Sequence, residues 1–206
     1  MKTSEMLYNE LFERYPALEV CKDEIYIAYK LIRECYCSGG KVLACGNGGS
    51  AADADHIVGE LMKGFLLKRC IDKPALNGDD EILSHLQGAL PAVSLNAHNA
   101  LLTAFANDLE FDYVYAQQVY GIGKKGDVLI ALSTSGNSAS VVNAVRAAGA
   151  AEIASVGITG SKESLMSEKC SVCIRLPETE TFKIQELTLP VYHCLCAMLE
   201  ADFFDN

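Results

Sequence analysis

Apolar positions along the chain follow two patterns, one of short unbroken runs and one of helical spacing. Short, mostly apolar runs are typical of strands that are buried in a parallel sheet. They lie at residues 41–45, 92–95, 127–132, 152–159 and 170–176. Helical spacing covers residues 4–37, 51–65, 100–106, 113–120, 139–148 and 181–203. Because strands and helices alternate, the pattern predicts an α/β fold, with one parallel sheet flanked by helices on both faces.

Glycine and proline mark the divisions of this pattern. Gly39 and Gly40 end the first helical segment directly before the first strand. We therefore expect a single domain over residues 1–206, with an N-terminal helical segment at 1–40 for packing or oligomerisation and an α/β core at 41–206. Pro190 falls inside the last helix, where its missing N–H predicts a kink.

Residues 66–91 interrupt the alternation with a polar, irregular stretch that holds only a short helical pattern near 81–87. A connection of this length is unusual inside an α/β domain, and such segments are usually binding elements or disordered. This one could close over a substrate or form a contact between subunits. The sequence favours neither role.

Composition narrows the class of protein. The chain has 206 residues and a formal net charge of −10, which argues against nucleic acid and anionic membranes as partners. No apolar run approaches the ~20 residues needed to cross a bilayer. Residues 1–5 lack an apolar signal region, so we expect a cytoplasmic protein.

The nine cysteines lie mostly in apolar segments, where a free thiol behaves as a small hydrophobic group. Cys170 and Cys173 have the spacing of half a zinc site or of a redox pair. No second pair of this spacing completes a zinc ribbon, and the two residues run into a predicted strand. We therefore predict that they are structural thiols.

Chemistry is first indicated where the strand at 41–45 meets the helix that follows it. Residues 45–50 read Cys-Gly-Asn-Gly-Gly-Ser. Glycines let the backbone approach a ligand closely, and the start of a helix offers free N–H groups and a positive dipole end to an anion such as phosphate. His56 and Glu60 follow at i and i+4, where they could share a metal ion or transfer protons. An ordinary glycine loop with a solvated His–Glu pair explains this stretch equally well.

A second strand–loop–helix unit carries four hydroxyl groups, those of Ser133, Thr134, Ser135 and Ser138. One hydroxyl is enough to cap a helix, so four favour a phosphate cradle over a cap. Ligands of doubly wound sheets bind beyond the carboxyl ends of the strands. Both loops are therefore expected at the same edge of the sheet.

The order and spacing of these motifs resemble a known family. The motifs are residues 45–50 with Asp53, His56 and Glu60, then Asn107–Asp108, residues 133–138, and residues 184–186 with His193. Over nearly its whole length the chain is similar to sugar isomerase (SIS) domain proteins of the phosphoheptose isomerase type. The resemblance implies their flavodoxin-like, doubly wound fold. The hydroxyl loop alone would indicate only the broad SIS superfamily, whereas the residues on the two helices are more specific.

The resemblance also implies a set of site residues. Zinc, one ion per subunit, would be held by His56, Glu60, Gln185 and His193. The substrate would be contacted by Asn47, Gly48, Gly49, Ser50, Glu60, Asn107, Asp108, Ser133, Thr134, Ser135, Ser138 and Gln185. Glu60 and His193 would be the acid–base pair.

The activity that the resemblance implies is aldose–ketose isomerisation of sedoheptulose 7-phosphate to D-glycero-D-manno-heptose 7-phosphate, in a homotetramer that shares its zinc sites between subunits. A carboxylate can remove the proton beside a carbonyl, an imidazole can serve the oxygens, and a Lewis-acid metal can stabilise the enediolate. Two other functions stay open. One is a non-catalytic SIS module that binds or senses a sugar phosphate, and the other is an SIS enzyme for a different sugar phosphate.

The chain departs from the family pattern around the sugar. The best-known members have an aspartate where this chain has Phe182, an arginine where it has Gly64 beside Lys63, and an aspartate where it has His98. The segment at 66–91 is also longer here. These departures affect the exact sugar more than the reaction.

Spacing along the last helix raises a geometric question. Gln185 and His193 are eight residues apart, which is about 12 Å along a helix and roughly 80° around it. Both would reach one ion only with extended side chains, a kink at Pro190 or help from a second subunit.

Overall fold

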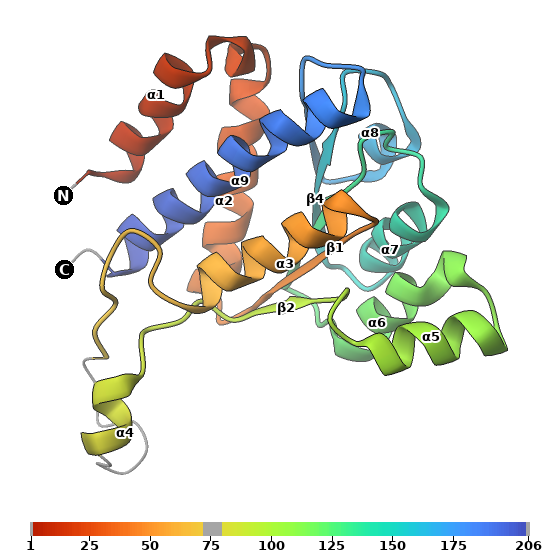
Figure 1. Ribbon diagram of the computed structural model, residues 1–206, viewed down its shortest axis with the longest axis horizontal. Coiled ribbons are helices and arrows are strands. Elements are labelled where there is room, and N and C mark those ends of the chain that lie inside the picture. The colour runs from red at the N-terminus through yellow and green to blue at the C-terminus, as the bar shows by residue number, and fades with distance from the viewer. Residues whose placement is uncertain (1, 72–79, 205–206) are drawn as a thin grey trace.

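Five parallel strands form the centre of the molecule in the computed structural model, which describes residues 2–71 and 80–204 (Figure 1). The strands are β1 Val42–Gly46, β2 Ala92–Ser94, β3 Val128–Leu132, β4 Ala154–Thr159 and β5 Val172–Arg175. Every adjacent pair is parallel, and the spatial order is β2-β1-β3-β4-β5. This is the flavodoxin-like order of a doubly wound sheet, so the predicted fold class is confirmed.

Helices precede and connect these strands. The α-helices are α1 Ser4–Arg14, α2 Lys22–Cys37, α3 Gly49–Met62, α4 Asp80–His85, α5 Asn99–Asp108, α6 Val114–Ile122, α7 Ala139–Ala150, α8 Leu165–Lys169 and α9 Thr181–Phe204. Two 3₁₀ segments, Pro16–Cys21 and Phe111–Tyr113, lead into α2 and α6. The predicted N-terminal segment therefore consists of α1 and α2, and both helices pack against α9.

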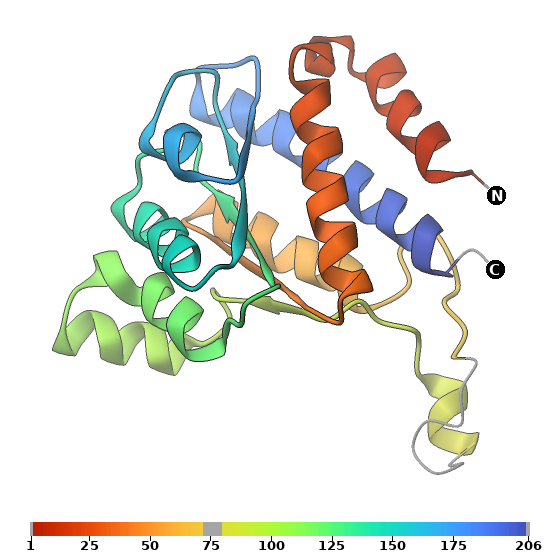
Figure 2. The same ribbon diagram turned by 180° about the vertical axis from the view of Figure 1, so that it is seen from behind.

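Two apolar cores lie on opposite faces of the sheet, because side chains alternate between the faces along each strand. Val42, Ala44 and Ile130 pack with α1, α2, α3 and α9 in one core. Leu43 and Leu129 pack with α6, α7 and α8 in the other. The two opposite views show α2, α3 and α9 on one side of the sheet and α6 and α7 on the other (Figures 1 and 2).

The helices α3 and α9 run side by side in the same direction (Figure 1). A Cβ atom at Gly49 would lie 2.5 Å from Gln185 Nε2, and farther along His56 Nδ1 lies 2.9 Å from the Tyr192 hydroxyl. Both pairs are separated by 136 residues in the chain. One register therefore relates the two helices along their shared length.

Several boundaries differ from the predicted ones for local reasons. The helix predicted at 51–65 begins at Gly49 and ends at Met62, because Lys63 has extended backbone. The strand predicted at 152–159 begins at Ala154, since Glu152 has φ +55° in the preceding turn. Helix α8 was not predicted. Its five residues are too few for a helical pattern, although Ser164 and Ser167 form a capping box at its start.

The last helix continues through Pro190 without a break. Its length and apolar composition match those of a membrane-spanning helix, although no unbroken apolar run in the sequence is that long. However, 61% of its most apolar window is buried inside the molecule, against α1, α2 and α3. Its apolar surface is therefore core surface. Of the irregular segment at 66–91, residues 72–79 lie outside the described residues, and its short helical pattern corresponds to α4.

Candidate active site and metal centre

The glycine loop and the hydroxyl loop meet where the sheet changes its direction of winding. The chain leaves β1 for α3 in one core layer and leaves β3 for α7 in the other. These strands are neighbours, so the loops after them border the same crevice, which is the usual ligand site of doubly wound sheets. A hydrogen bond of 2.9 Å from Asn47 Nδ2 to Ser140 Oγ joins the glycine loop to the first turn of α7, directly after the hydroxyl loop. The predicted convergence is confirmed.

Side chains from beyond the sheet edge hold the glycine loop in place. The Gly46 carbonyl accepts hydrogen bonds from Asn96 Nδ2 at 2.8 Å and from the Tyr115 hydroxyl at 2.7 Å. Gly48 has φ +58°, a conformation that favours glycine, and it precedes α3 without a side-chain cap. The start of α3 is therefore left open to a ligand, as the motif predicts.

The hydroxyl loop gathers its serines around a tight turn. Ser133 Oγ lies 3.2 Å from Ser138 Oγ and 3.4 Å from Ser135 Oγ, while Gly136 takes φ +65° between them. Ser138 occupies the N-cap position of α7, yet its side chain makes no capping hydrogen bond. The capping interpretation therefore does not account for this hydroxyl. A tetrahedral anion could accept hydrogen bonds from such a group of hydroxyls.

Three ionisable side chains from α3 and α9 form a cluster farther along the helix pair. The candidate ligand atoms of His56, Glu60 and His193 all lie within 4.8 Å of one another. His56 Nε2 is 3.0 Å from Glu60 Oε1 and 3.4 Å from His193 Nε2. Burial, and next the neighbouring His56, lower the pKa of His193. His193 is therefore neutral at neutral pH, as a metal ligand or a proton acceptor must be.

Neighbouring side chains orient this cluster. Tyr192 places its hydroxyl 2.9 Å from His56 Nδ1 and 3.3 Å from Asp53 Oδ1. Lys63 Nζ lies 3.1 Å from Glu60 Oε2, next to the position where the family pattern has an arginine. The ring of Phe65 contacts His193 at a centroid distance of 5.3 Å. Glu60 is therefore a largely buried carboxylate, its side chain 12% exposed, with a cation on one side and an imidazole on the other.

A buried ion pair ties the end of α3 to α9 below the cluster. Arg69 and Glu200 are each 1% exposed, and Arg69 Nε donates to Glu200 Oε1 at 2.8 Å. Glu200 also accepts the backbone N–H groups of residues 65–67. Arg69 donates in turn to the backbone carbonyls of Glu60 and Leu61. The last turn of α3, which carries Glu60, is therefore fastened to α9 through these two charges.

The remaining predicted residues lie elsewhere. Gln185 faces Gly49, two helical turns from the level of His56, or about 10 Å along the helix. Asn107 and Asp108 are exposed at the end of α5, where Asn107 Nδ2 donates to Asp108 Oδ1 at 2.9 Å. Among the described residues, no hydrogen bond joins this pair to the cluster. The structure thus brings three of the four predicted zinc ligands together within one chain.

Two of the three residues at which the chain departs from the family pattern are exposed to solvent, and the third, Gly64, is partly buried. Phe182 is 57% exposed at the start of α9, and His98 is exposed before α5. Gly64 begins the turn that leads to Arg69. A pocket of about 510 Å³ lies between α1, residues 65–67 and α9, and His193 forms part of its lining.

Sequence reasoning did not predict roles for Tyr192, Arg69 and Glu200. Glu200 had a signal, since it follows an unbroken apolar run at 194–199 on a helix and a carboxylate there needs a partner. Tyr192 had none, because its partners are fixed only by the register of two helices that are distant in the chain.

The donor atoms of the cluster fit a divalent metal ion such as zinc. Two imidazole nitrogens and a carboxylate oxygen are the ligand types of catalytic zinc sites, which keep a further position open. The neutral state of His193 fits the same purpose, because a protonated imidazole has no lone pair to offer.

Comparison with known proteins gives concordant findings. A family model described as the SIS domain matches residues 8–90 and 84–160. A phosphoheptose isomerase of Rhodospirillum rubrum is 42% identical over 163 residues, which are 79% of this chain and 77% of that protein.

Solved structures agree with this. A phosphoheptose isomerase from Neisseria gonorrhoeae superposes with a TM-score of 0.76 at 31% identity, covering 94% of this chain and 95% of the other. One from Francisella tularensis gives 0.77 at 28% identity, covering 96% and 98%.

Proposed function

Because this chain belongs to the SIS domain family, and within it to the phosphoheptose isomerases, we propose that it interconverts sedoheptulose 7-phosphate and D-glycero-D-manno-heptose 7-phosphate. One observation carries the proposal. The start of α3, which the hydroxyl loop adjoins, and a cluster of acid–base side chains lie on the same pair of helices, about two turns apart. A sugar with its phosphate at one end and its reacting carbons at the other needs a site of this form.

The phosphate end is assigned to the two loops. Ser133, Thr134, Ser135 and Ser138 supply hydroxyls, and Asn47, Gly48, Gly49 and Ser50 supply an amide and backbone N–H groups at the start of α3. Gln185, which faces Gly49, supplies a further amide to the substrate. Fixing the phosphate holds the far carbons beside the cluster, and such orientation accounts for several kcal/mol of a barrier when it is well achieved.

Proton transfer is assigned to the cluster. Glu60 removes the proton from the carbon beside the carbonyl and returns it to the neighbouring carbon. His193, neutral because its pKa is lowered, exchanges protons with the substrate oxygens. Lys63 Nζ, 3.1 Å from Glu60 Oε2, helps to hold that carboxylate in position.

Zinc, one ion per subunit, is the proposed cofactor. His56, Glu60 and His193 would hold it, and when bound it would act as a Lewis acid toward substrate oxygens. Gln185 is the fourth ligand that the family resemblance implies. From its place beside Gly49 it would reach the ion only by rearrangement or across a subunit boundary.

We further propose a cytoplasmic homotetramer. Support comes from exposed apolar side chains at Phe111, Tyr113 and Tyr120, which a subunit contact would cover. The exposed pair Asn107–Asp108 beside them would then serve the site of a neighbouring subunit. A non-catalytic sugar-phosphate binder is not favoured, since binding alone requires neither Glu60 nor His193.

Turnover of sedoheptulose 7-phosphate by the purified protein, with and without added zinc, tests the proposal. The expected result is zinc-dependent formation of the aldose phosphate that is lost in Glu60→Gln and kept in Glu152→Gln, an exposed control. A folded, zinc-loaded protein that produces no aldose phosphate would reject this substrate. A panel of other sugar phosphates would then distinguish altered specificity from a binding role.

A further inference from the structure

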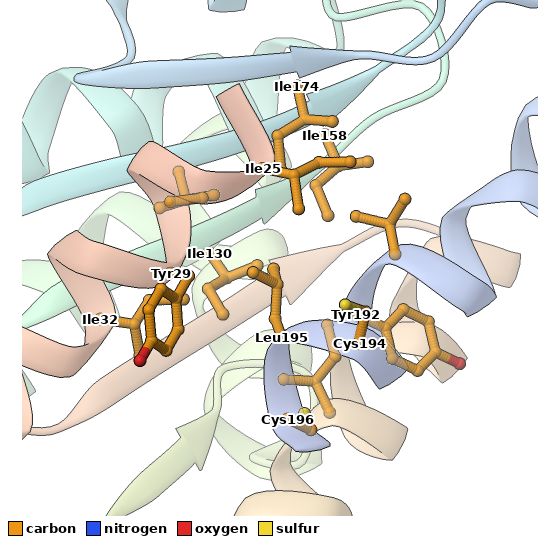
Figure 3. Packing of buried hydrophobic residues seen from close by; sticks show 14 of the residues in the cluster. Ile25, Tyr29, Ile32, Ile130, Ile158, Ile174, Tyr192, Cys194, Leu195 and Cys196 are labelled. Atoms are coloured by element: carbon orange, nitrogen blue, oxygen red, sulfur yellow. The ribbon is translucent and has the colours of Figure 1, made fainter. Parts of the chain in front are cut away.

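The Tyr192 hydroxyl lies between two side chains of α3. It is 2.9 Å from His56 Nδ1 and 3.3 Å from Asp53 Oδ1. Tyr192 is 1% exposed, and its ring packs in the core between α9 and the sheet. The hydroxyl oxygen points away from the isoleucine and leucine side chains of that core (Figure 3). The tyrosine thus delivers one polar group to the buried side of His56.

The proton positions follow from what each group can do. An ionised Asp53 can only accept, and a tyrosine hydroxyl has a single proton to donate. When Tyr192 donates to Asp53, its oxygen is left to accept the proton of His56 Nδ1. The other ring nitrogen, Nε2, then carries the lone pair. This assignment rests on the hydrogen-bonding capacity of the three groups.

The surroundings of Nε2 favour the opposite arrangement. Glu60 Oε1 lies 3.0 Å from His56 Nε2 and would accept a proton from it. With the proton there, the nitrogen that faces Glu60 and His193 could not bind a metal ion. Glu60 and the pair Asp53–Tyr192 therefore compete for the position of one proton.

We propose that Asp53 and Tyr192 are positioning residues that hold the proton of His56 on Nδ1 and so keep Nε2 free as a metal ligand. Partners behind a ligating histidine commonly act in this way, through a carboxylate or carbonyl. Here a tyrosine relays the effect of the carboxylate. The inference rests on the metal centre assigned under Proposed function and adds two residues outside its ligand set.

Zinc affinity, measured by competition with a chelator, tests the inference in Tyr192→Phe and Asp53→Asn. Loss of a partner behind a ligating histidine typically weakens metal binding by about 10-fold to 100-fold, and both variants are expected to fall in this range. Activity lost at limiting zinc should return at excess zinc. Tyr36→Phe is the matched control. It also removes a buried tyrosine hydroxyl, one that has no hydrogen-bond partner in the described part of the chain, and should leave zinc affinity unchanged.

The ¹⁵N NMR signals of His56 in the zinc-free protein report its tautomer, which would not change if Asp53 and Tyr192 had only a structural role. The wild-type protein should show the Nδ1–H form, and both variants should shift toward Nε2–H. Unchanged zinc affinity and an unchanged tautomer in folded variants would overturn the inference. If the wild-type protein binds no zinc, or if binding survives loss of His56 and His193, the proposed metal centre itself fails.

Discussion

The hydroxyl loop at 133–138 and the cluster of His56, Glu60 and His193 differ in how the chain builds them. The loop takes its groups from six consecutive residues around one glycine turn. The cluster takes them from two helices, and its imidazoles are 137 residues apart in the chain. The loop therefore depends on local backbone geometry, while the cluster depends on the register of α3 against α9. Substitutions that loosen the helix pair should damage the cluster and spare the loop.

The largest expected effect concerns the buried pair Arg69–Glu200. Glu200→Gln leaves the Arg69 charge without a partner, and removing one member of a buried pair typically lowers the free energy of unfolding by about 3–5 kcal/mol. Urea denaturation measures this loss. Zinc affinity should fall as well, because Arg69 also holds the carbonyl of Glu60.

Glu152→Gln is the control for this prediction. Its pair with Lys125 is exposed on both sides, so the expected loss is at most about 1 kcal/mol. If the two variants unfold at the same urea concentration, the buried pair does not fasten the helices.

The next effect concerns Gly49, where the glycine loop and the helix pair meet. A Cβ atom there would lie 2.5 Å from Gln185 Nε2, the mobile end of a side chain. Gly49→Ala should therefore leave the protein folded but displace the Gln185 amide. A displacement of this size can lower kcat/KM by about 100-fold.

Gly59→Ala on the same helix is the matched control, because a Cβ atom there meets no atom of residues 2–71 and 80–204 within 4 Å. It should keep full activity and raise the free energy of unfolding by about 0.4–1 kcal/mol. Equal activity of the two variants would remove Gln185 from the proposed substrate contacts.

A smaller effect is expected from one hydroxyl of the loop. Hydrogen bonds to charged groups contribute about 1.5 kcal/mol or more, so Ser138→Ala should raise KM for the phosphorylated substrate about 10-fold. Stability and zinc affinity should hardly change, because Ser138 makes no capping hydrogen bond.

Thr3→Ala is expected to have the opposite effects to Ser138→Ala. Thr3 Oγ1 does cap its helix, accepting from Met6 N, so its loss should cost about 1 kcal/mol of stability and leave KM unchanged. A Ser138→Ala variant with normal KM would contradict the phosphate cradle.

The smallest effect concerns a thiol behind the hydroxyl loop. Cys173 Sγ lies 3.6 Å from Thr159 Oγ1, and the next residue, Gly160, donates to the carbonyl of Thr134. The Cys170 thiol donates a hydrogen bond to Cys173, which lowers the pKa of Cys173 and raises that of Cys170.

Thiolate at Cys173 therefore accumulates as pH rises through a value below the ordinary one for cysteine. Pulsed alkylation followed by peptide mass spectrometry should label Cys173 at lower pH than Cys45, whose pKa burial raises to about 12. Cys170→Ala should move the labelling of Cys173 to higher pH. If the pH at which Cys173 is labelled does not change in this variant, Cys170 does not affect the pKa of Cys173.

The sequence was sufficient to predict the sheet and both loops, because the patterns that indicate them are local. An apolar run followed by glycine or by several serines describes a strand end and a ligand loop within about ten residues, whatever the rest of the chain does. The proximity of His56 and Glu60 could also be predicted, since i and i+4 spacing places them on one helix face. Family resemblance then supplied His193, which no local pattern singles out.

Features that depend on contacts between distant segments could not be predicted. Tyr192 meets His56 and Asp53 only when α9 packs on α3 in one particular register. Arg69 lies in an irregular turn whose path is set by Glu200, a residue 131 positions later. Helix α8 was missed for a different reason, since five residues show no period. Local pattern thus predicted the cradle, and packing decided the surroundings of the cluster.

The place of α9 in the chain has a consequence for how the protein is made. Chains begin to fold from the N-terminal side while they are being synthesised. Helix α9 follows all five strands, so the sheet and both ligand loops can take shape before His193 and Glu200 have been added. Until then the nascent chain exposes the apolar face that α9 later covers. The protein would therefore form the two loops proposed to hold phosphate early in its synthesis, and would complete the cluster of His56, Glu60 and His193 only when the last helix docks.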